Sequence, residues 1–263
     1  MNKPMKKAII VVSFGTTYEE TRKKNIENII NELKDKYPSC KVAQAYTSSI
    51  VRKKLLKDGI EIPDVSEILG HLHQEGYEDI VILSTHVIPG EEYEMLEAAV
   101  CEQREKFHSC HVSAPLLATD KDCADVLEVL WEEYGGENRG ILAMGHGSAH
   151  PANAWYIRLN EIIKERGMQN FYVATVEGTP TVADAIAFFK GQDCTSITLV
   201  PLMFVAGDHA VNDMAGEEKD SWKSHFEKEG YQVNTVLKGL GEYVSIRGLY
   251  KKHLEDVMYG GRS

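Results

Sequence analysis

Residues 8–17 read AIIVVSFGTT, an apolar, β-branched run that ends in a turn of serine, glycine and threonine. An uninterrupted run of this kind is typical of a strand buried on both faces, as in a parallel sheet. Similar runs recur along the chain, separated by stretches of helical period. The predicted strands are 8–13, 41–46, 79–84, 111–114, 140–144, 172–176, 196–201 and 232–236. The predicted helices are 18–37, 65–74, 93–108, 121–134, 152–166, 182–189, 212–229 and 243–258. This alternation predicts an α/β fold of parallel sheets flanked by helices.

The opening stretch has a counterpart in the second half of the chain. Residues 140–149 read GILAMGHGSA, which places Phe14 opposite His146. The second strand, VAQAYTS from residue 42, corresponds to YVATVEGTP from residue 172, so that Tyr46 lies opposite Glu177. Two correspondences in the same order indicate an internal duplication.

A third correspondence joins the segments that follow. DIVILSTHVIPGEEYEM, from residue 79, aligns with SITLVPLMFVAGDHAVND, from residue 196, and Glu92 falls opposite His209. We therefore predict two similar domains, residues 1–135 and 136–263, divided in the Gly-rich stretch 135–139. Ligands of open α/β sheets bind beyond the carboxyl ends of the strands, so the strand-end loops are expected to line a cleft between the two domains.

Three side chains at predicted strand ends of the second half are candidate metal ligands. His146 lies between two glycines in GHGS, Glu177 closes the run VATVE, and His209 lies in VAGDHAVND. Each has a structural alternative: a hydrogen-bonded histidine at His146, a helix cap or ion pair at Glu177, and a turn at His209. Together they form a mixed nitrogen and oxygen set suited to Co2+, Fe2+, Ni2+ or Zn2+, with coordination positions left for water or substrate.

The first half has acidic and basic candidates at the matching places. Glu91 and Glu92 follow the third strand. A charge that complements a helix N-terminus is the preferred interpretation of Glu91, while Glu92, the counterpart of His209, is predicted to face the cleft from the opposite wall. His86, just upstream, is a weaker candidate. Arg52, in the run Arg52-Lys53-Lys54, either lies on a solvated helix face or binds a substrate carboxylate through both nitrogens.

The net charge of the chain limits the kinds of partner that it is expected to bind. With 40 Asp and Glu against 29 Lys and Arg, the formal net charge is −11. Nucleic-acid-binding proteins usually present a basic face, so we expect no nucleic-acid partner. An anionic substrate would have to be held by local basic groups, because the net negative charge of the chain repels it.

Neither a membrane nor a secretory segment is expected. No apolar run approaches the roughly 20 residues that a membrane span requires, and the run 8–12 is predicted to be a strand rather than part of a signal peptide. The five cysteines form no CxxC pair. We therefore expect a cytoplasmic protein with no membrane partner.

Motifs of several common enzyme classes are missing from the sequence. It contains no GxxxxGK[ST], so a P-loop nucleotide site is not predicted. No GxGxxG opens a helix after the first strand, and no GxSxG is present, which argues against a dinucleotide site and a hydrolase nucleophile.

The motif set as a whole resembles one family. It resembles the anaerobic sirohydrochlorin cobaltochelatases, class II chelatases related to the ferrochelatases, over nearly the whole chain. The motifs that carry this resemblance are IVVSFGTT (10–17), AYTSSIVRKKL (45–55), HVIPGEEYE (86–94), GHGS (145–148), VEGTP (176–180) and PLMFVAGDHAVNDMAG (201–216).

The resemblance implies two chelatase-like, flavodoxin-like domains that insert Co2+ into sirohydrochlorin without ATP or an organic cofactor, in anaerobic cobalamin biosynthesis. It implies that His146 and His209 hold the metal, that Glu177 can join them, and that Glu92, with Glu91 as the alternative, faces them. We expect His146, His209 and Glu92 to act in catalysis.

The expected substrate contacts are Phe14, Tyr46, Arg52 and Glu91. The sequence leaves two alternative functions open: a ferrochelatase that inserts Fe2+ into sirohydrochlorin or a porphyrin, and a carrier that binds a tetrapyrrole or metal without catalysis. It also leaves open whether the chain assembles into a homo-oligomer.

Overall fold

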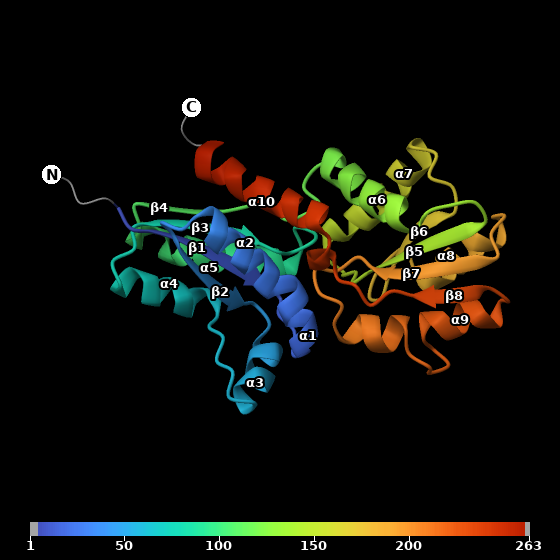
Figure 1. Cartoon of the computed structure of the whole chain (residues 1–263), viewed down its shortest axis with the longest axis horizontal. Helices are drawn as coiled ribbons and strands as arrows, with labels where there is room; N and C mark the ends of the chain where they lie inside the picture. Colours follow the sequence, from blue (N-terminus) through green and yellow to red (C-terminus); the bar gives the residue numbers. More distant parts are fainter. Residues whose placement is uncertain (1–4, 261–263) are drawn as a thin grey trace. The chain divides into compact units, whose positions relative to one another are not determined.

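Two four-stranded parallel sheets organise the computed structural model, which describes residues 5–260 (Figure 1). The first has the order β2-β1-β3-β4 and the second the order β6-β5-β7-β8. Every predicted strand is present, displaced by two residues or fewer at its ends: β1 (Lys7–Ser13), β2 (Lys41–Tyr46), β3 (Asp79–Ser84), β4 (Ser109–Val112), β5 (Arg139–Gly145), β6 (Phe171–Thr175), β7 (Ser196–Pro201) and β8 (Gln232–Thr235). The repeated order, which begins as in flavodoxin-like sheets, confirms the predicted pair of similar α/β folds.

Helices follow nearly every strand. They are α1 (Glu19–Arg22), the π-helical η1 (Lys23–Glu27), α2 (Asn28–Lys36), α3 (Ser49–Lys57), α4 (Val65–Gln74), α5 (Glu91–Gln103), η2 (Arg104–Lys106), α6 (Asp120–Tyr134), η3 (Pro151–Asn153), α7 (Ala154–Glu165), α8 (Val182–Lys190), the π-helical η4 (Ala210–Met214), α9 (Trp222–Lys228), η5 (Leu240–Glu242) and α10 (Val244–Tyr259). Within residues 5–260, no helix has both the length and the apolarity to cross a membrane.

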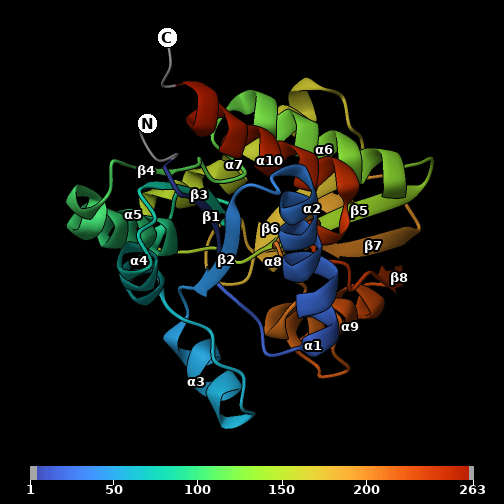
Figure 2. The same cartoon turned by 60° about the vertical axis from the view of Figure 1, so that its left-hand side comes forward.

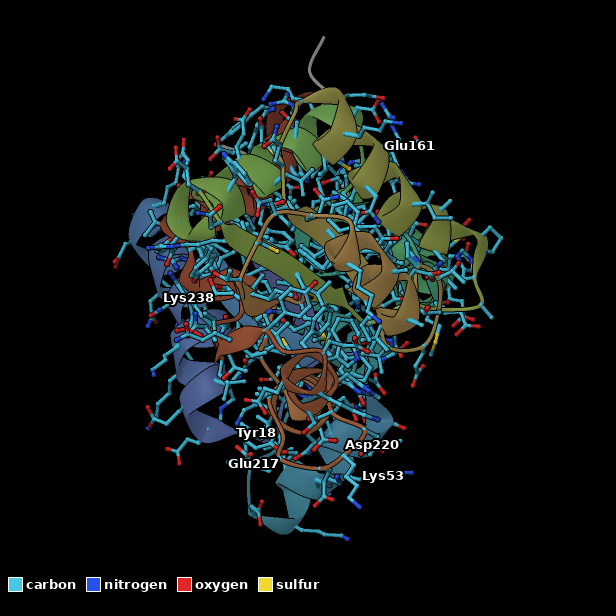
Figure 3. The ribbon with its side chains drawn as sticks, turned by 90° about the vertical axis from the view of Figure 1, so that its right-hand side faces the viewer. Tyr18, Lys53, Glu161, Glu217, Asp220 and Lys238 are labelled. Atoms are coloured by element: carbon cyan, nitrogen blue, oxygen red, sulfur yellow. The ribbon has the colours of Figure 1, made fainter. Side chains whose placement is uncertain are left out.

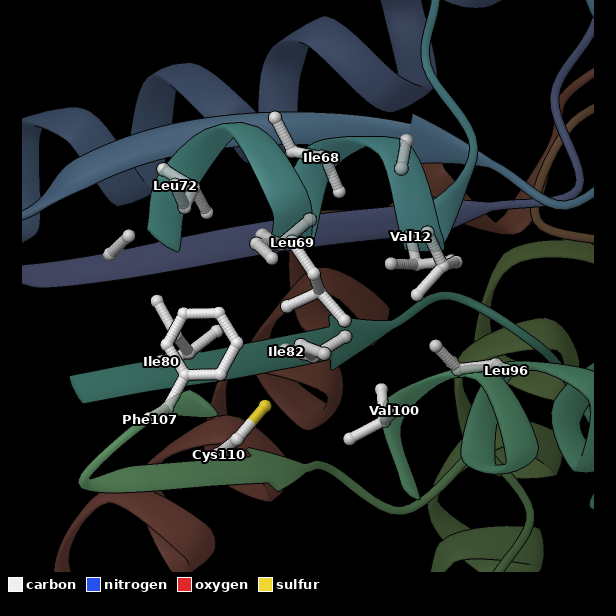
Figure 4. Close-up of a cluster of buried hydrophobic side chains, with 14 of the residues drawn as sticks. Val12, Ile68, Leu69, Leu72, Ile80, Ile82, Leu96, Val100, Phe107 and Cys110 are labelled. Carbon is white, nitrogen blue, oxygen red and sulfur yellow. The ribbon is translucent and has the colours of Figure 1, made fainter. Parts of the chain in front are cut away.

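The first sheet is buried on both faces, as its apolar strands predicted. Ala8, Ile10 and Val12 of β1 belong to a buried cluster with Leu69 of α4 and Leu96 of α5. Figure 4 shows Val12, Leu69 and Leu96 in this cluster. Side chains alternate along a strand, so the intervening residues of β1 face the opposite side. There α2 and α10 run along the sheet (Figure 2).

The second sheet repeats this plan. Leu142 and Met144 of β5 pack in a buried cluster with Phe189 of α8 and with Trp222 and Phe226 of α9. The helices α6 and α7 pack against one another and against strands β5 and β6. Parallel strands covered by helices on both faces leave the carboxyl-end loops as the place for polar chemistry.

The compact units of the chain are not divided at residue 135. One unit runs to Leu116 and resumes at Arg247, whereas the other comprises Leu117–Ile246. The reason is an exchange of helices: α6 packs on α7 in the second unit, while α10 returns to the first. There Arg247 pairs with Glu32 at 2.7 Å, and the Tyr250 hydroxyl donates to the Thr85 carbonyl at 3.0 Å.

One predicted helix, 212–229, is wrong as a continuous element. The π-helical turn η4 ends at Met214, and α9 begins only at Trp222. Gly216 closes the first segment, its N–H donating to the Asn212 carbonyl at 3.2 Å. The Ser221 hydroxyl caps the second segment by accepting from the Ser224 N–H at 3.1 Å. Glycine and an N-cap serine are ordinary signals for the end and the start of a helix. The prediction missed them because the helical period of the sequence continues through the break.

Candidate metal centre

The loops after β5, β6 and β7 bring three predicted side chains together. His146 directly follows β5, Glu177 lies two residues beyond β6, and His209 ends the loop that leads from β7 to η4. Because the three strands are parallel and adjacent, these loops leave the same edge of the sheet. One potential ligand atom from each of the three side chains lies within 4.8 Å of the others, and the described residues contain no other such group.

His146 is oriented by the glycine that follows it. Its Nδ1 lies 2.9 Å from the Gly147 carbonyl oxygen, which can only accept, so Nδ1 carries the proton and Nε2 keeps its lone pair. Gly147 has φ +80°, and a Cβ there would come within 2.7 Å of the Gly178 nitrogen and of the Thr175 Cβ. Only glycine allows this close approach of the loops after β5 and β6.

The same region of backbone positions Glu177. Its N–H donates to the His146 carbonyl at 2.8 Å. Asn153 bridges the two loops: its Oδ1 accepts from the Ser148 N–H at 3.1 Å, and its Nδ2 donates to the Thr179 carbonyl at 2.7 Å. Asn153 is buried, so this bridge holds His146 and Glu177 at a defined separation.

His209 is oriented by an aspartate, Asp213, that the sequence did not predict as a site residue. Asp213, one helical turn later in η4, accepts from His209 Nδ1 at 2.5 Å. A carboxylate on the far nitrogen of a metal-binding histidine selects the tautomer and raises the basicity of the ligand. The signal was present in the sequence as the i, i+4 spacing of His209 and Asp213.

The arrangement suits a divalent ion of borderline softness. The imidazole rings of His146 and His209 have centroids 4.8 Å apart and nearly perpendicular planes. Metal bonds to histidine and carboxylate are about 2.0–2.2 Å long, so three ligand atoms within 4.8 Å of one another lie at about the separation that a shared ion requires. The exposed fractions of the side chains are 46% for His146, 58% for Glu177 and 31% for His209. Three accessible ligands leave coordination positions for water or substrate.

Replacing Asp213 by asparagine should weaken Co2+ binding by roughly tenfold to a hundredfold. An amide oxygen still accepts from Nδ1, but it lacks the charge that strengthens the bond and raises the basicity of Nε2. Calorimetric titration with Co2+ measures the change. Asp220→Asn, which removes an exposed acidic charge from the same unit, is the matched control, and equal affinities in the two variants would contradict the role of Asp213.

The acidic candidates of the first unit lie in the first turn of α5. Glu91 is exposed, whereas Glu92 is half-buried, and its Oε2 has no hydrogen-bond partner among residues 5–260. His86 is buried beside Ser84, whose hydroxyl lies 2.9 Å from its Nδ1. Burial lowers the pKa of His86 to about 4, so the imidazole is neutral near pH 7. That Glu92 faces the metal stays a prediction.

The two aromatic candidates lie at the ends of neighbouring strands but differ in exposure. Phe14, after β1, is 45% exposed, while Tyr46, at the end of β2, is fully buried. The Tyr46 ring fills the space beside Gly15, where a Cβ would come within 2.4 Å of it. Burial raises the pKa of the Tyr46 hydroxyl to about 12. Phe14 is thus available to a ligand directly, and Tyr46 supports the turn that presents it.

Arg52 is already paired within its own unit. Its Nη2 lies 3.0 Å from Asp64 Oδ2, and its Nη1 lies 3.1 Å from Glu67 Oε2. The predicted bidentate contact between Arg52 and a substrate carboxylate would require both ion pairs to break.

Comparisons with known proteins find chelatases that are similar over nearly the whole chain. The family model described as cobalt chelatase (CbiK) matches residues 7–259. A sirohydrochlorin cobaltochelatase of Salmonella typhimurium is 36% identical over 257 residues, covering 97% of each chain. The sirohydrochlorin cobaltochelatase CbiKC of Nitratidesulfovibrio vulgaris is 29% identical over 254 residues, covering 95% of this chain and 89% of that one. The solved structure of SirB from Bacillus subtilis with Fe3+ matches the fold with a TM-score of 0.67 at 11% identity, covering 98% of this chain and 97% of that one.

Proposed function

This chain belongs to the cobalt chelatase (CbiK) family, and from that membership we propose that it is an enzyme that inserts Co2+ into sirohydrochlorin. The observation that carries the proposal is the group His146, Glu177 and His209, which supplies a mixed nitrogen and oxygen set at the ligand-binding edge of a parallel sheet.

The tautomers of the two histidines support a role in holding the incoming metal. A metal ligand must be a neutral imidazole with a free lone pair. Nδ1 is engaged by the Gly147 carbonyl in His146 and by the Asp213 carboxylate in His209, so both residues would bind through Nε2. Glu177 would add a carboxylate oxygen and offset part of the metal charge. With three protein ligands, the ion keeps open positions that the pyrrole nitrogens can take one after another.

Insertion also releases two protons from pyrrole nitrogens, and these need an acceptor. Glu92 is a suitable one, because its buried Oε2 makes no hydrogen bond within residues 5–260 and is free to accept. A carboxylate in a partly buried position is a common general base. We propose that Glu92 accepts these protons one at a time, passing the first to solvent before it takes the second, while His146 and His209 release the metal to the ring.

Two further features of the proposed reaction are the identity of the metal and the absence of a need for ATP. Imidazole and carboxylate ligands accept Fe2+ as well as Co2+, and the relatives are named for cobalt. Transfer of a divalent ion to a ring with four nitrogen donors is favourable by itself, so we propose that ATP is not needed. Nor does the proposed chemistry require an organic cofactor.

A single spectrophotometric experiment tests the proposal. The purified protein is mixed with sirohydrochlorin and Co2+ or Fe2+, with and without ATP, and the absorption of the metal-loaded ring is followed over time. We expect catalytic turnover with Co2+ that ATP does not change. Preferred turnover with Fe2+ would indicate a ferrochelatase, and a stoichiometric spectral shift without metal insertion would indicate a carrier.

A further inference from the structure

One face of α3 combines positive charge with an exposed apolar side chain. Ile50, Lys53, Lys54 and Lys57 occupy positions i, i+3, i+4 and i+7, which share one side of a helix. All four are exposed, and Ile50 is 66% exposed. Lys53 extends from the α3 ribbon (Figure 3). We call these four residues the basic face of α3.

The rest of α3 serves to hold the helix in place. Leu55, its one buried residue, anchors the opposite side. Arg52 ties the helix to α4 through the ion pairs with Asp64 and Glu67. The Ser48 hydroxyl caps its N-terminus by accepting from the Val51 N–H. The helix is thus positioned without any contribution from the basic face.

Within residues 5–260, the three lysines of the basic face form no ion pair, whereas some exposed lysines of other helices do. Lys23 pairs with Glu19 and Lys121 with Asp125 on their own helices. The range 49–57 contains no acidic residue, and no carboxylate in residues 5–260 forms an ion pair with Lys53, Lys54 or Lys57.

A helix that gathers like charges at these spacings is destabilised by their repulsion. Lys54 and Lys57 lie in the last turn, where they complement the helix dipole. The dipole explains neither Lys53 nor the exposed Ile50. Three lysines on one face of a short helix are also unusual in a chain whose net charge is −11.

The helix also starts at the edge of the sheet where ligands bind. It begins three residues beyond β2, and the Thr47 N–H joins this loop to the Ser13 carbonyl at the end of β1 at 3.0 Å. The usual ligand site of an open α/β sheet lies beyond the carboxyl ends of the strands at the switch point, here between β1 and β3, and β2 is the neighbour of β1. Figures 1 and 2 both show α3 projecting from its own sheet.

We propose that the basic face of α3 binds the peripheral carboxylates of the tetrapyrrole substrate, with Ile50 against the apolar face of the ring. The inference rests on the proposed function. A flat macrocycle that carries several carboxylates matches three unpaired ammonium groups around an exposed isoleucine. These lysines meet the need, set by the net charge, for local basic groups that hold an anionic substrate. They do so in place of Arg52, whose guanidinium is already paired.

The test measures binding of metal-free sirohydrochlorin, separately from metal insertion. In the triple variant K53E/K54E/K57E we expect affinity to fall roughly tenfold or more, as loss of several exposed ion pairs implies. The wild-type affinity should fall as NaCl is added, and the variant should show a flatter salt dependence. Affinity for Co2+ alone should stay unchanged. The variant K53Q/K54Q/K57Q, which keeps a high helix propensity, should lie between the two.

The control variant K34E/K164E/K252E makes the same change in net charge at exposed lysines elsewhere. Wild-type affinity in both α3 variants would overturn the inference, as would an equal loss of affinity in the control. A wild-type protein that inserts Co2+ while the α3 variants bind the ring normally would overturn this inference alone. A wild-type protein that inserts no metal would overturn the proposed function and, with it, the inference.

Discussion

Alanine at His146 or at His209 should abolish cobalt insertion while both units stay folded. Each imidazole supplies one of three ligand atoms within 4.8 Å of one another, and removing one leaves two, too few to hold a divalent ion against water. Loss of a direct ligand should exceed the tenfold to hundredfold cost of losing an outer hydrogen bond. We therefore expect turnover to fall by at least about a hundredfold in each variant.

Both substitutions should leave stability nearly unchanged, because both side chains are partly exposed and belong to no apolar cluster. Turnover with sirohydrochlorin, Co2+ titration and thermal unfolding separate a binding defect from a folding defect. His225→Ala, on α9 of the same unit and outside the metal-binding group, is the matched control. Turnover retained in both the His146 and the His209 variant would refute the assignment.

Alanine at Gly147 should damage both the metal site and the stability of the second unit. The added Cβ would lie 2.7 Å from the Gly178 nitrogen and from the Thr175 Cβ, and neither atom can move without the backbone. A non-glycine residue at φ +80° adds conformational strain. We expect the free energy of unfolding to fall by roughly 3 kcal/mol, as for other severe backbone substitutions.

The metal site should fail in Gly147→Ala because the Gly147 carbonyl orients His146. A displacement of about 1 Å in a positioned group costs around a hundredfold in rate, and we expect a loss of this size in turnover. Gly167→Ala is the matched control: Gly167 also has a positive φ, +64°, but a Cβ there meets nothing within 4 Å. Denaturant unfolding and Co2+ titration compare the two, and similar losses in both would show that strain alone, without the loop contact, accounts for the effect.

Arg52 shows why the residues that hold a substrate are harder to predict than those that hold a metal. Its position after a strand end suggested a contact with a substrate carboxylate. In the fold, Asp64 and Glu67 lie at the start of the next helix and accept hydrogen bonds from Nη2 and Nη1 of Arg52. Only the three-dimensional arrangement shows that Arg52 is paired, whereas Lys53, Lys54 and Lys57 form no ion pair within residues 5–260.

Local patterns in the sequence determined the strands, their parallel arrangement and the duplication, because apolar periodicity records how each segment is buried. They also placed His146, Glu177 and His209 at strand ends, and parallel neighbouring strands bring such ends to one edge. Tertiary structure alone decided which distant groups meet: Glu177 with the His146 carbonyl, Arg52 with Asp64 and Glu67, and α10 with the first unit. Pairing depends on distance and on competition among groups far apart in the chain, and periodicity carries no information about either.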